Sequence, residues 1–261
     1  MSISFDRAAA YYDETRSLPD ALMEQLVSRL VAELPRGELC LEIGVGTGRI
    51  ALPLALAGIR LAGVDISTEM LRKLREKDGA LPVARADATR LPFSDHTFGA
   101  AIASHVLHLI PAWRQALDEL VRVVRPGGVL IASRGGGSRV EWQRAVRSRF
   151  FEAAGRAPAA PGADRMAEVD DEMHRRGATV TEIEDVKVES TATIGALIAA
   201  LEKGVYSACW SIDDDTRARA AAATREWARI ELGDLDVSRP VRHQSDWRAY
   251  RLARPTGSSA E

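Results

Sequence analysis

Cysteine, long apolar runs and an excess of charge of one sign are all scarce in this chain. Cys40 and Cys209 stand alone without metal-ligand spacing, and Cys40 falls in a predicted strand, so we expect a buried, inert thiol there. No apolar run approaches the roughly 18 residues of a membrane span, and the polar, acidic N-terminus is unlike a signal peptide. A formal net charge of −2 gives no electrostatic basis for binding nucleic acid. These absences predict a cytoplasmic protein without a membrane or nucleic-acid partner.

A glycine-rich loop follows the first predicted strand. The strand ends at Glu42, and Gly44, Gly46 and Gly48 then lead into a predicted helix. Glycines let the backbone approach a ligand closely, and the start of the helix points free N–H groups toward it. A dinucleotide fingerprint needs its third glycine where Arg49 stands, which is evidence against a nicotinamide or flavin cofactor.

The next two predicted strands each end in an aspartate. Asp65 follows Arg60-Leu61-Ala62-Gly63-Val64, and Asp87 follows Pro82-Val83-Ala84-Arg85-Ala86. Both carboxylates should therefore meet at the carboxyl edge of a parallel sheet, where ligands of open α/β sheets bind. Asp65 is placed to accept ribose hydroxyls, and Asp87 to accept an exocyclic amine such as that of adenine. Because the loop lacks a Walker-type lysine, an adenosine without phosphates fits best.

These features belong to a set of four motifs. They are Glu42-x-Gly44-x-Gly46-x-Gly48, Gly63-Val64-Asp65-Ile66-Ser67 with Met70, Ala86-Asp87-Ala88, and Arg125-Pro126-Gly127-Gly128. In this order and spacing the set resembles the class I S-adenosylmethionine-dependent methyltransferases, and within them the small-molecule branch called methyltransferase type 11. The likeness extends over about residues 5–134.

The resemblance implies the roles of the site residues. Gly44 and Gly46 of the loop that ends at Gly48 would pass under the methionine part of the cofactor, and Asp65 would hold the ribose. Ile66 and Met70 would pack on adenine, Asp87-Ala88 would read its edge, and Ser104 would also lie in the cofactor site. Glu42 replaces the commoner aspartate and keeps the charge.

The order of the predicted elements fits an α/β fold. A chain of 261 residues, 46% of them hydrophobic, can bury one sizeable core. The resemblance implies a Rossmann-like, mostly parallel seven-stranded sheet with helices on both faces, an antiparallel last strand and helical lid elements. We expect a single domain over 1–261, with a helical lid segment over 1–37, a cofactor-binding core over 38–134 and a C-terminal half over 135–261. Besides the strands above, the patterns predict strands over 100–104, 129–133, 179–190 and 247–252, and helices over 19–34, 48–57, 67–78, 111–124, 139–154, 165–176, 193–203 and 213–232.

Two segments are candidate lids. Tyr11-Tyr12-Asp13-x-x-Arg16 resembles the family's N-terminal segment, in which Tyr12 would cover the sulfonium side and Arg16 would reach the methionine carboxylate. Ordinary tyrosine packing with a surface arginine is the alternative. A helical insertion over about 193–233 carries Tyr206 and Trp210 at i, i+4 spacing, where core packing is the default and an apolar substrate pocket the alternative.

Two histidines follow the fourth predicted strand. His105 would occupy the site-facing position and is our candidate catalytic and substrate-contacting residue, since imidazole is a general base near neutral pH. His108 falls where the family commonly has a histidine, which favours a structural or cofactor-side role, with substrate contact as the alternative. Their i, i+3 spacing suits a metal, but no third ligand is close in sequence, and we predict no metal site.

The predicted reaction transfers the sulfonium methyl to a small-molecule acceptor and leaves S-adenosylhomocysteine. Two alternatives stay open: a protein that binds S-adenosylmethionine or its product without methyl transfer, and a dinucleotide-dependent oxidoreductase, which Arg49 and Asp87 disfavour. The sequence specifies neither the acceptor nor the atom methylated, and it allows a monomer or a homodimer.

Overall fold

The computed structural model describes residues 4–16, 18–135, 140–157, 161–184, 186, 188–243 and 245–254. The chain divides into two compact units. The first comprises Met1–Arg134, Pro161–Val186 and Ser245–Glu261, and the second comprises Gly135–Ala160 and Lys187–Gln244. The predicted single-domain organisation stays a prediction.

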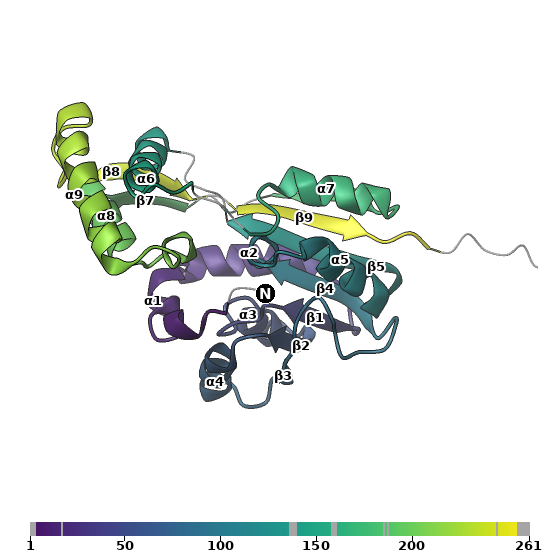
Figure 1. Ribbon diagram of the computed structural model, residues 1–261. Coiled ribbons are helices and arrows are strands. Elements are labelled where there is room, and N and C mark those ends of the chain that lie inside the picture. Colours follow the sequence, from purple (N-terminus) through teal and green to yellow (C-terminus); the bar gives the residue numbers. More distant parts are fainter. Residues whose placement is uncertain are drawn as a thin grey trace, which may run out of the picture. The chain divides into compact units, whose positions relative to one another are not determined.

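The first unit contains a seven-stranded sheet in the order β3-β2-β1-β4-β5-β9-β6 (Figure 1). Its strands are β1 (Leu39–Ile43), β2 (Arg60–Asp65), β3 (Val83–Arg85), β4 (Phe98–Ser104), β5 (Val124–Gly135), β6 (Thr179–Ile183) and β9 (Ser245–Arg251). Strands β3, β2, β1, β4 and β5 pair in parallel, and β9 pairs with β6 in antiparallel fashion. The predicted mostly parallel sheet with an antiparallel last strand is confirmed.

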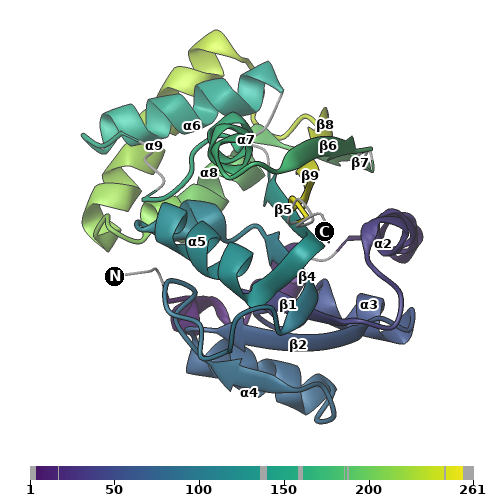
Figure 2. The same ribbon diagram turned by 90° about the vertical axis from the view of Figure 1, so that its right-hand side faces the viewer.

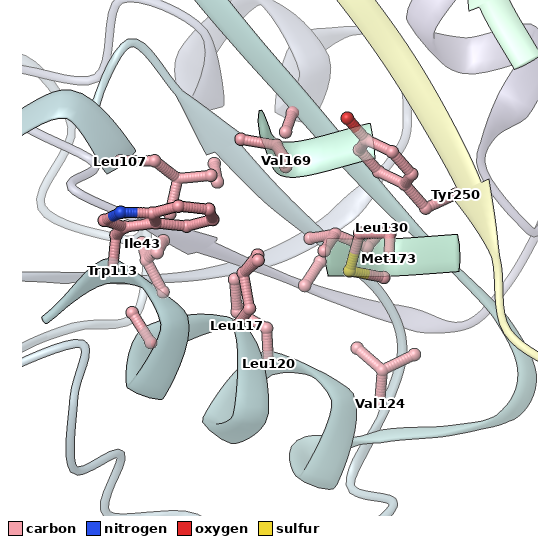
Figure 3. Packing of buried hydrophobic residues seen from close by; sticks show 14 of the residues in the cluster. Ile43, Leu107, Trp113, Leu117, Leu120, Val124, Leu130, Val169, Met173 and Tyr250 are labelled. Atoms are coloured by element: carbon pink, nitrogen blue, oxygen red, sulfur yellow. The ribbon is translucent and has the colours of Figure 1, made fainter. Parts of the chain in front are cut away.

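Helices cover both faces of this sheet (Figure 2). One apolar cluster joins the sheet to α5 (Trp113–Val123) and α7 (Met166–Arg175). Figure 3 shows part of this cluster, in which Trp113 of α5 lies beside Leu107 and Ile43. Leu117 and Leu120 of the same helix face the side where Leu130 of β5 lies. A second cluster joins the opposite face to α2 (Asp20–Glu33), α3 (Ala51–Leu56) and α4 (Thr68–Lys77). Because both faces are covered, β1 and β4 read as nearly continuous apolar runs.

Three short helices complete the first unit: η1 (Asp6–Ala8), α1 (Tyr12–Arg16) and η2 (Leu107–Leu109). Helix α4 begins where the Ser67 hydroxyl accepts the N–H of Met70, as expected of an N-cap serine. Cys40 is buried in β1, and burial raises the pKa of its thiol, in agreement with the predicted inert residue.

The second unit contains α6 (Glu141–Ala153), α8 (Ile194–Glu202), η3 (Ser207–Cys209) and α9 (Asp214–Glu231), together with an antiparallel pair, β7 (Val188–Ala192) and β8 (Arg239–His243). Its core is a separate apolar cluster built from α6, α8, η3 and α9. Within the described residues of both units, no helix is long and apolar enough to cross a bilayer.

One predicted strand is wrong. The segment 179–190 forms two strands, β6 and β7, which belong to different sheets. The apolar residues Val180, Ile183 and Val186 do not keep a period of two, so one continuous strand would turn Ile183 to the face opposite its neighbours. Strand β8 was absent from the prediction, since Arg239–His243 carries charge and a proline and lacks an apolar alternation.

Candidate functional site

The glycine loop joins β1 to α3 at the carboxyl edge of the sheet. A Cβ atom at Gly44 would lie 2.5 Å from Val106, and one at Gly48 would collide with Leu74, so packing alone excludes side chains at both positions. Gly46 has a φ of +56°, and the nearest atom to a Cβ there would be the Gly44 carbonyl oxygen at 3.9 Å. The space in front of Gly46 is therefore open, and this is where a ligand can approach the backbone.

Asp65, at the end of β2, ties this loop to the start of α4. Its Oδ2 accepts the N–H of Gly46 and its Oδ1 accepts the N–H of Ser67, each at 2.8 Å. Burial raises the pKa of the Asp65 carboxyl, and the backbone hydrogen bonds counteract that effect. Each carboxylate oxygen has a second lone pair and can accept a further hydrogen bond.

Glu42, at the end of β1, is 2% exposed, and its Oε2 has no hydrogen-bond partner among the described residues. Burial raises the pKa of its carboxyl to about 8; Arg49 opposes the rise and Asp65 adds to it. This carboxyl interacts with Asp65, which in turn holds Gly46, and its unsatisfied buried oxygen fits an ammonium group of a ligand.

The residues predicted to contact adenine follow β2 and β3 or lie in α4. Ile66 is half-buried after β2, whereas Met70 in the first turn of α4 is only 2% exposed. Asp87 and Ala88 follow β3 and are half-buried. The Asp87 Oδ1 accepts both the backbone N–H and the hydroxyl of Thr89, at 2.9 and 2.8 Å, which fixes the carboxylate at the sheet edge.

The end of β4 holds His105 in an unusual conformation. Its φ is +52°, a value uncommon for residues other than glycine, and its backbone N–H donates to the Ser133 carbonyl at 3.0 Å. The imidazole meets the buried indole of Trp247 edge to face at 6.3 Å between centroids. Ser104, 8% exposed, lies 3.5 Å from the Ser133 hydroxyl. Backbone and ring contacts thus fix the position of His105.

His108 lies in η2, and its carbonyl accepts the N–H of Gly162 at 3.0 Å. This bond anchors the segment that leads into α7, which is consistent with the structural role favoured for this position. Among the described residues, no three His, Cys, Asp or Glu side chains form a group that could hold a metal ion.

The predicted lid residues are only partly described. Tyr12 packs edge to face on Phe5 at 6.0 Å between ring centroids. The Arg16 side chain lies outside the described part of the chain, so its role stays a prediction. Tyr206 and Trp210 belong to the second unit, where Arg147 stacks on the Tyr206 ring at 4.1 Å and the Trp210 indole donates to the Gly204 carbonyl. Their roles as substrate contacts stay predictions.

Two acidic residues of the N-terminal segment reach the site without having been predicted as site residues. Asp6 contacts the start of α4, and Asp13 contacts Thr47 in the glycine loop. Ser67, to which Asp6 is attached, can be recognised in the sequence as a helix N-cap. No sequence pattern identifies its partner.

A family comparison bears directly on this site. Residues 41–132, which run from β1 through the glycine loop to β5, match the model of the methyltransferase domain family. The chain contains a class I S-adenosylmethionine-dependent methyltransferase domain.

The methyltransferase domain also matches individual proteins. A demethylmenaquinone methyltransferase of Clavibacter sepedonicus is 36% identical over 138 residues, which make up 50% of this chain and 56% of that protein. The match thus spans only about half the length of that relative.

Two solved structures have the same fold. The YcgJ protein of Bacillus subtilis superposes with a TM-score of 0.61 at 15% identity over 90% of this chain and 99% of that one. Phosphoethanolamine N-methyltransferase 2 of Haemonchus contortus, in complex with S-adenosylhomocysteine, gives a TM-score of 0.56 at 16% identity over 95% of this chain and 58% of that one. At such identities the similarity establishes the fold alone.

Proposed function

We propose that this chain binds S-adenosylmethionine at the carboxyl edge of β1, β2 and β3 and transfers its methyl group to a small-molecule acceptor. The observation that supports this most is the cluster of Glu42, the open side of Gly46, and Asp65 at one edge. Glu42 has a buried oxygen without a partner, and Asp65 has lone pairs left for ribose hydroxyls. These groups fit an adenosine that carries an amino acid.

Each of these site residues would have a distinct role in binding. Glu42 would receive the ammonium, Asp65 the ribose hydroxyls, and Asp87 with Ala88 the adenine edge. Bound S-adenosylmethionine supplies a methyl group already activated by its positive sulfur. The protein then contributes alignment of acceptor and methyl group, which can lower a barrier by roughly 7–11 kcal/mol.

His105 would serve an acceptor that must lose a proton. As the new bond to the methyl group forms, the imidazole takes up the proton that the acceptor releases. Its backbone bond to Ser133 and its contact with Trp247 hold the ring in place for this role. The Clavibacter relative is named for an acceptor with a quinone ring. Acidic phenols and quinols are therefore the first acceptor class to test.

Two measurements separate the proposal from its alternatives. Calorimetric titration of S-adenosylhomocysteine and of NAD tests the donor site: binding of NAD alone would favour an oxidoreductase. Transfer of a radiolabelled methyl group to a panel that includes demethylmenaquinone, simple phenols and amines tests the reaction. Tight binding of S-adenosylhomocysteine without transfer to any acceptor in the panel or in a host metabolite extract would favour a binding protein.

Asp65→Ala should weaken S-adenosylhomocysteine binding. The substitution removes the partner of the ribose hydroxyls and the brace between Gly46 and Ser67. Hydrogen bonds to a charged group are worth about 1.5–3 kcal/mol, so we expect Kd to rise roughly 10- to 150-fold by calorimetry. Asp78→Ala is the matched control, because it removes a carboxylate that accepts the Ala80 N–H at the opposite end of α4. Equal affinity of the folded Asp65 variant and the wild type would remove Asp65 from the site.

A further inference from the structure

The N-terminal segment is attached to both loops of the proposed donor site through two carboxylates. Figure 1 shows this segment beside α4. Asp6 lies in η1 and Asp13 lies in α1. Both residues belong to the same compact unit as the loops that they contact.

Asp13 holds the glycine loop. Its Oδ1 accepts the hydroxyl of Thr47 at 2.6 Å, and its Oδ2 lies 2.7 Å from the Lys77 ammonium. The same ammonium donates to the Thr47 carbonyl at 2.9 Å. Thr47 is fully buried, so its hydroxyl depends on Asp13 and its carbonyl on Lys77 for a hydrogen-bond partner. Burial alone would raise the pKa of Asp13, but hydrogen bonds from Lys77 and Thr47 outweigh it and lower the pKa.

Asp6 holds the turn after β2. Its Oδ1 accepts the hydroxyl of Ser67 at 2.6 Å and the backbone N–H of Glu69 at 3.1 Å. The hydroxyl of Ser67 in turn caps α4. A negative charge at this helix N-terminus is stabilised by the free N–H groups there. Hydrogen bonds from Ser67, Ser4 and Glu69 lower the pKa of Asp6, so it is ionised at neutral pH.

Asp65 connects these two attachments. It accepts the N–H of Gly46, the neighbour of Thr47, and the N–H of Ser67, the partner of Asp6. The path from Asp13 through Thr47, Asp65 and Ser67 to Asp6 is therefore continuous, and the N-terminal segment closes it into a ring. A ligand held by Asp65 would contact the residue that joins the two attachments.

We infer that Asp6 and Asp13 are positioning residues of the donor site, and that docking of residues 4–14 and binding of the nucleoside ligand stabilise each other. The inference rests on the proposed function. Docking fixes the glycine loop and the turn before α4 in the geometry that Asp65 requires. A ligand that fixes the same loops holds Thr47 and Ser67, the partners of Asp13 and Asp6, in place. Because such coupling is reciprocal, the factor by which docking raises ligand affinity equals the factor by which the ligand stabilises docking.

The test measures both sides of this coupling on the full chain, with S-adenosylhomocysteine as the probe. Asp6→Ala and Asp13→Ala should each raise Kd roughly tenfold by calorimetry. In the wild type, saturating ligand should slow hydrogen exchange of residues 4–14. The factor of this slowing should equal the factor by which the Asp6→Ala/Asp13→Ala variant loses ligand affinity. In the Asp6→Ala/Asp13→Ala variant this ligand-dependent slowing should disappear.

Glu14→Ala is the matched control. Glu14 follows Asp13 on α1, is exposed, and makes no hydrogen bond or ion pair with any described residue, so its loss should leave Kd unchanged. Thr47→Val should repeat the Asp13→Ala loss, and combining the two should cost no more than either alone. Thr47→Ser keeps the hydroxyl and should restore affinity, which a purely volume-dependent effect would not show.

The outcomes separate the inference from the proposed function. If the wild type binds S-adenosylhomocysteine and the Asp6 and Asp13 variants bind it equally well, the segment is not coupled to the site and the inference fails alone. Unchanged exchange of residues 4–14 on ligand binding would have the same meaning. If the wild type itself does not bind the ligand, the proposed donor site is wrong and the inference falls with it. Thermal denaturation identifies variants that have lost the fold, and the Thr47→Val and Thr47→Ser pair then decides.

Discussion

His105→Ala should slow methyl transfer to a proton-losing acceptor by about 10²- to 10⁴-fold, the usual cost of losing a general base. The Kd of S-adenosylhomocysteine should change little, because the imidazole is assigned to the acceptor and not to the donor. Radiolabelled methyl transfer gives the rate, and calorimetry gives the affinity.

Backbone strain needs a separate control here. His105 has a φ of +52°, and alanine tolerates that conformation less well than asparagine does. His105→Asn keeps the backbone conformation accessible but removes the base, so it should be as slow as the alanine variant. His96 has a φ of +58° and donates its N–H to Arg122, away from the proposed site. His96→Asn is therefore the same change at the same backbone geometry and should keep the full rate.

Two results would contradict the assignment of His105. Full activity of His105→Asn would make His105 a packing residue against Trp247. Equal losses in affinity and rate would place it on the donor side.

Glu42→Gln should stabilise the ligand-free protein at neutral and alkaline pH. The pKa of Glu42 is about 8 in the folded chain, against 4.5 for an ordinary glutamate. Between these two values the unfolded chain releases this proton and the folded chain keeps it, so the free energy of unfolding falls as pH rises. The fall is about 1.4 kcal/mol per pH unit and on the order of 5 kcal/mol in all. Below pH 4.5 and above pH 8 the contribution is constant.

Urea denaturation between pH 5 and pH 8 measures this effect. Glutamine does not titrate, so the advantage of Glu42→Gln over the wild type should grow steadily across that range. Glu38→Gln is the opposite case, because the hydrogen bond from Arg125 lowers the pKa of Glu38. Its contribution is lost only as pH falls through that lowered value, so its effect should be constant from pH 5 to pH 8. Parallel curves for the wild type and Glu42→Gln would show that Glu42 is ionised in the folded protein.

The sheet and the residues at its carboxyl edge could be predicted from the sequence for a simple reason. In a parallel sheet the strand ends align, so acids that terminate consecutive apolar runs, such as Glu42 and Asp65, must meet. The same logic failed for 179–190, because a short polar break between two strands looks like continued alternation. It also failed for β8, whose charged residues carry no strand pattern.

The attachments of the N-terminal segment could not be predicted for another reason. Asp13 meets Thr47 across 34 positions, and Asp6 meets Ser67 across 61. Each is a single contact between common surface residue types, without periodicity or fixed spacing. Such contacts depend on where the folded loops place two hydroxyls, which local propensity does not encode.

The place of β9 has a consequence for how the chain folds. It lies between β5 and β6 in the sheet, yet it is the last strand of the described residues, and the segment Lys187–Gln244 of the second unit is inserted between β6 and β9. On the ribosome, β6 emerges long before β9, with which it pairs. The backbone hydrogen bonds of β6 to β9 can therefore form only after residues 245–251 have been synthesised. Strand pairings between residues so far apart in sequence form slowly. We expect folding of the first unit to finish only after synthesis of β9, and nascent chains that stop before it to depend on chaperones.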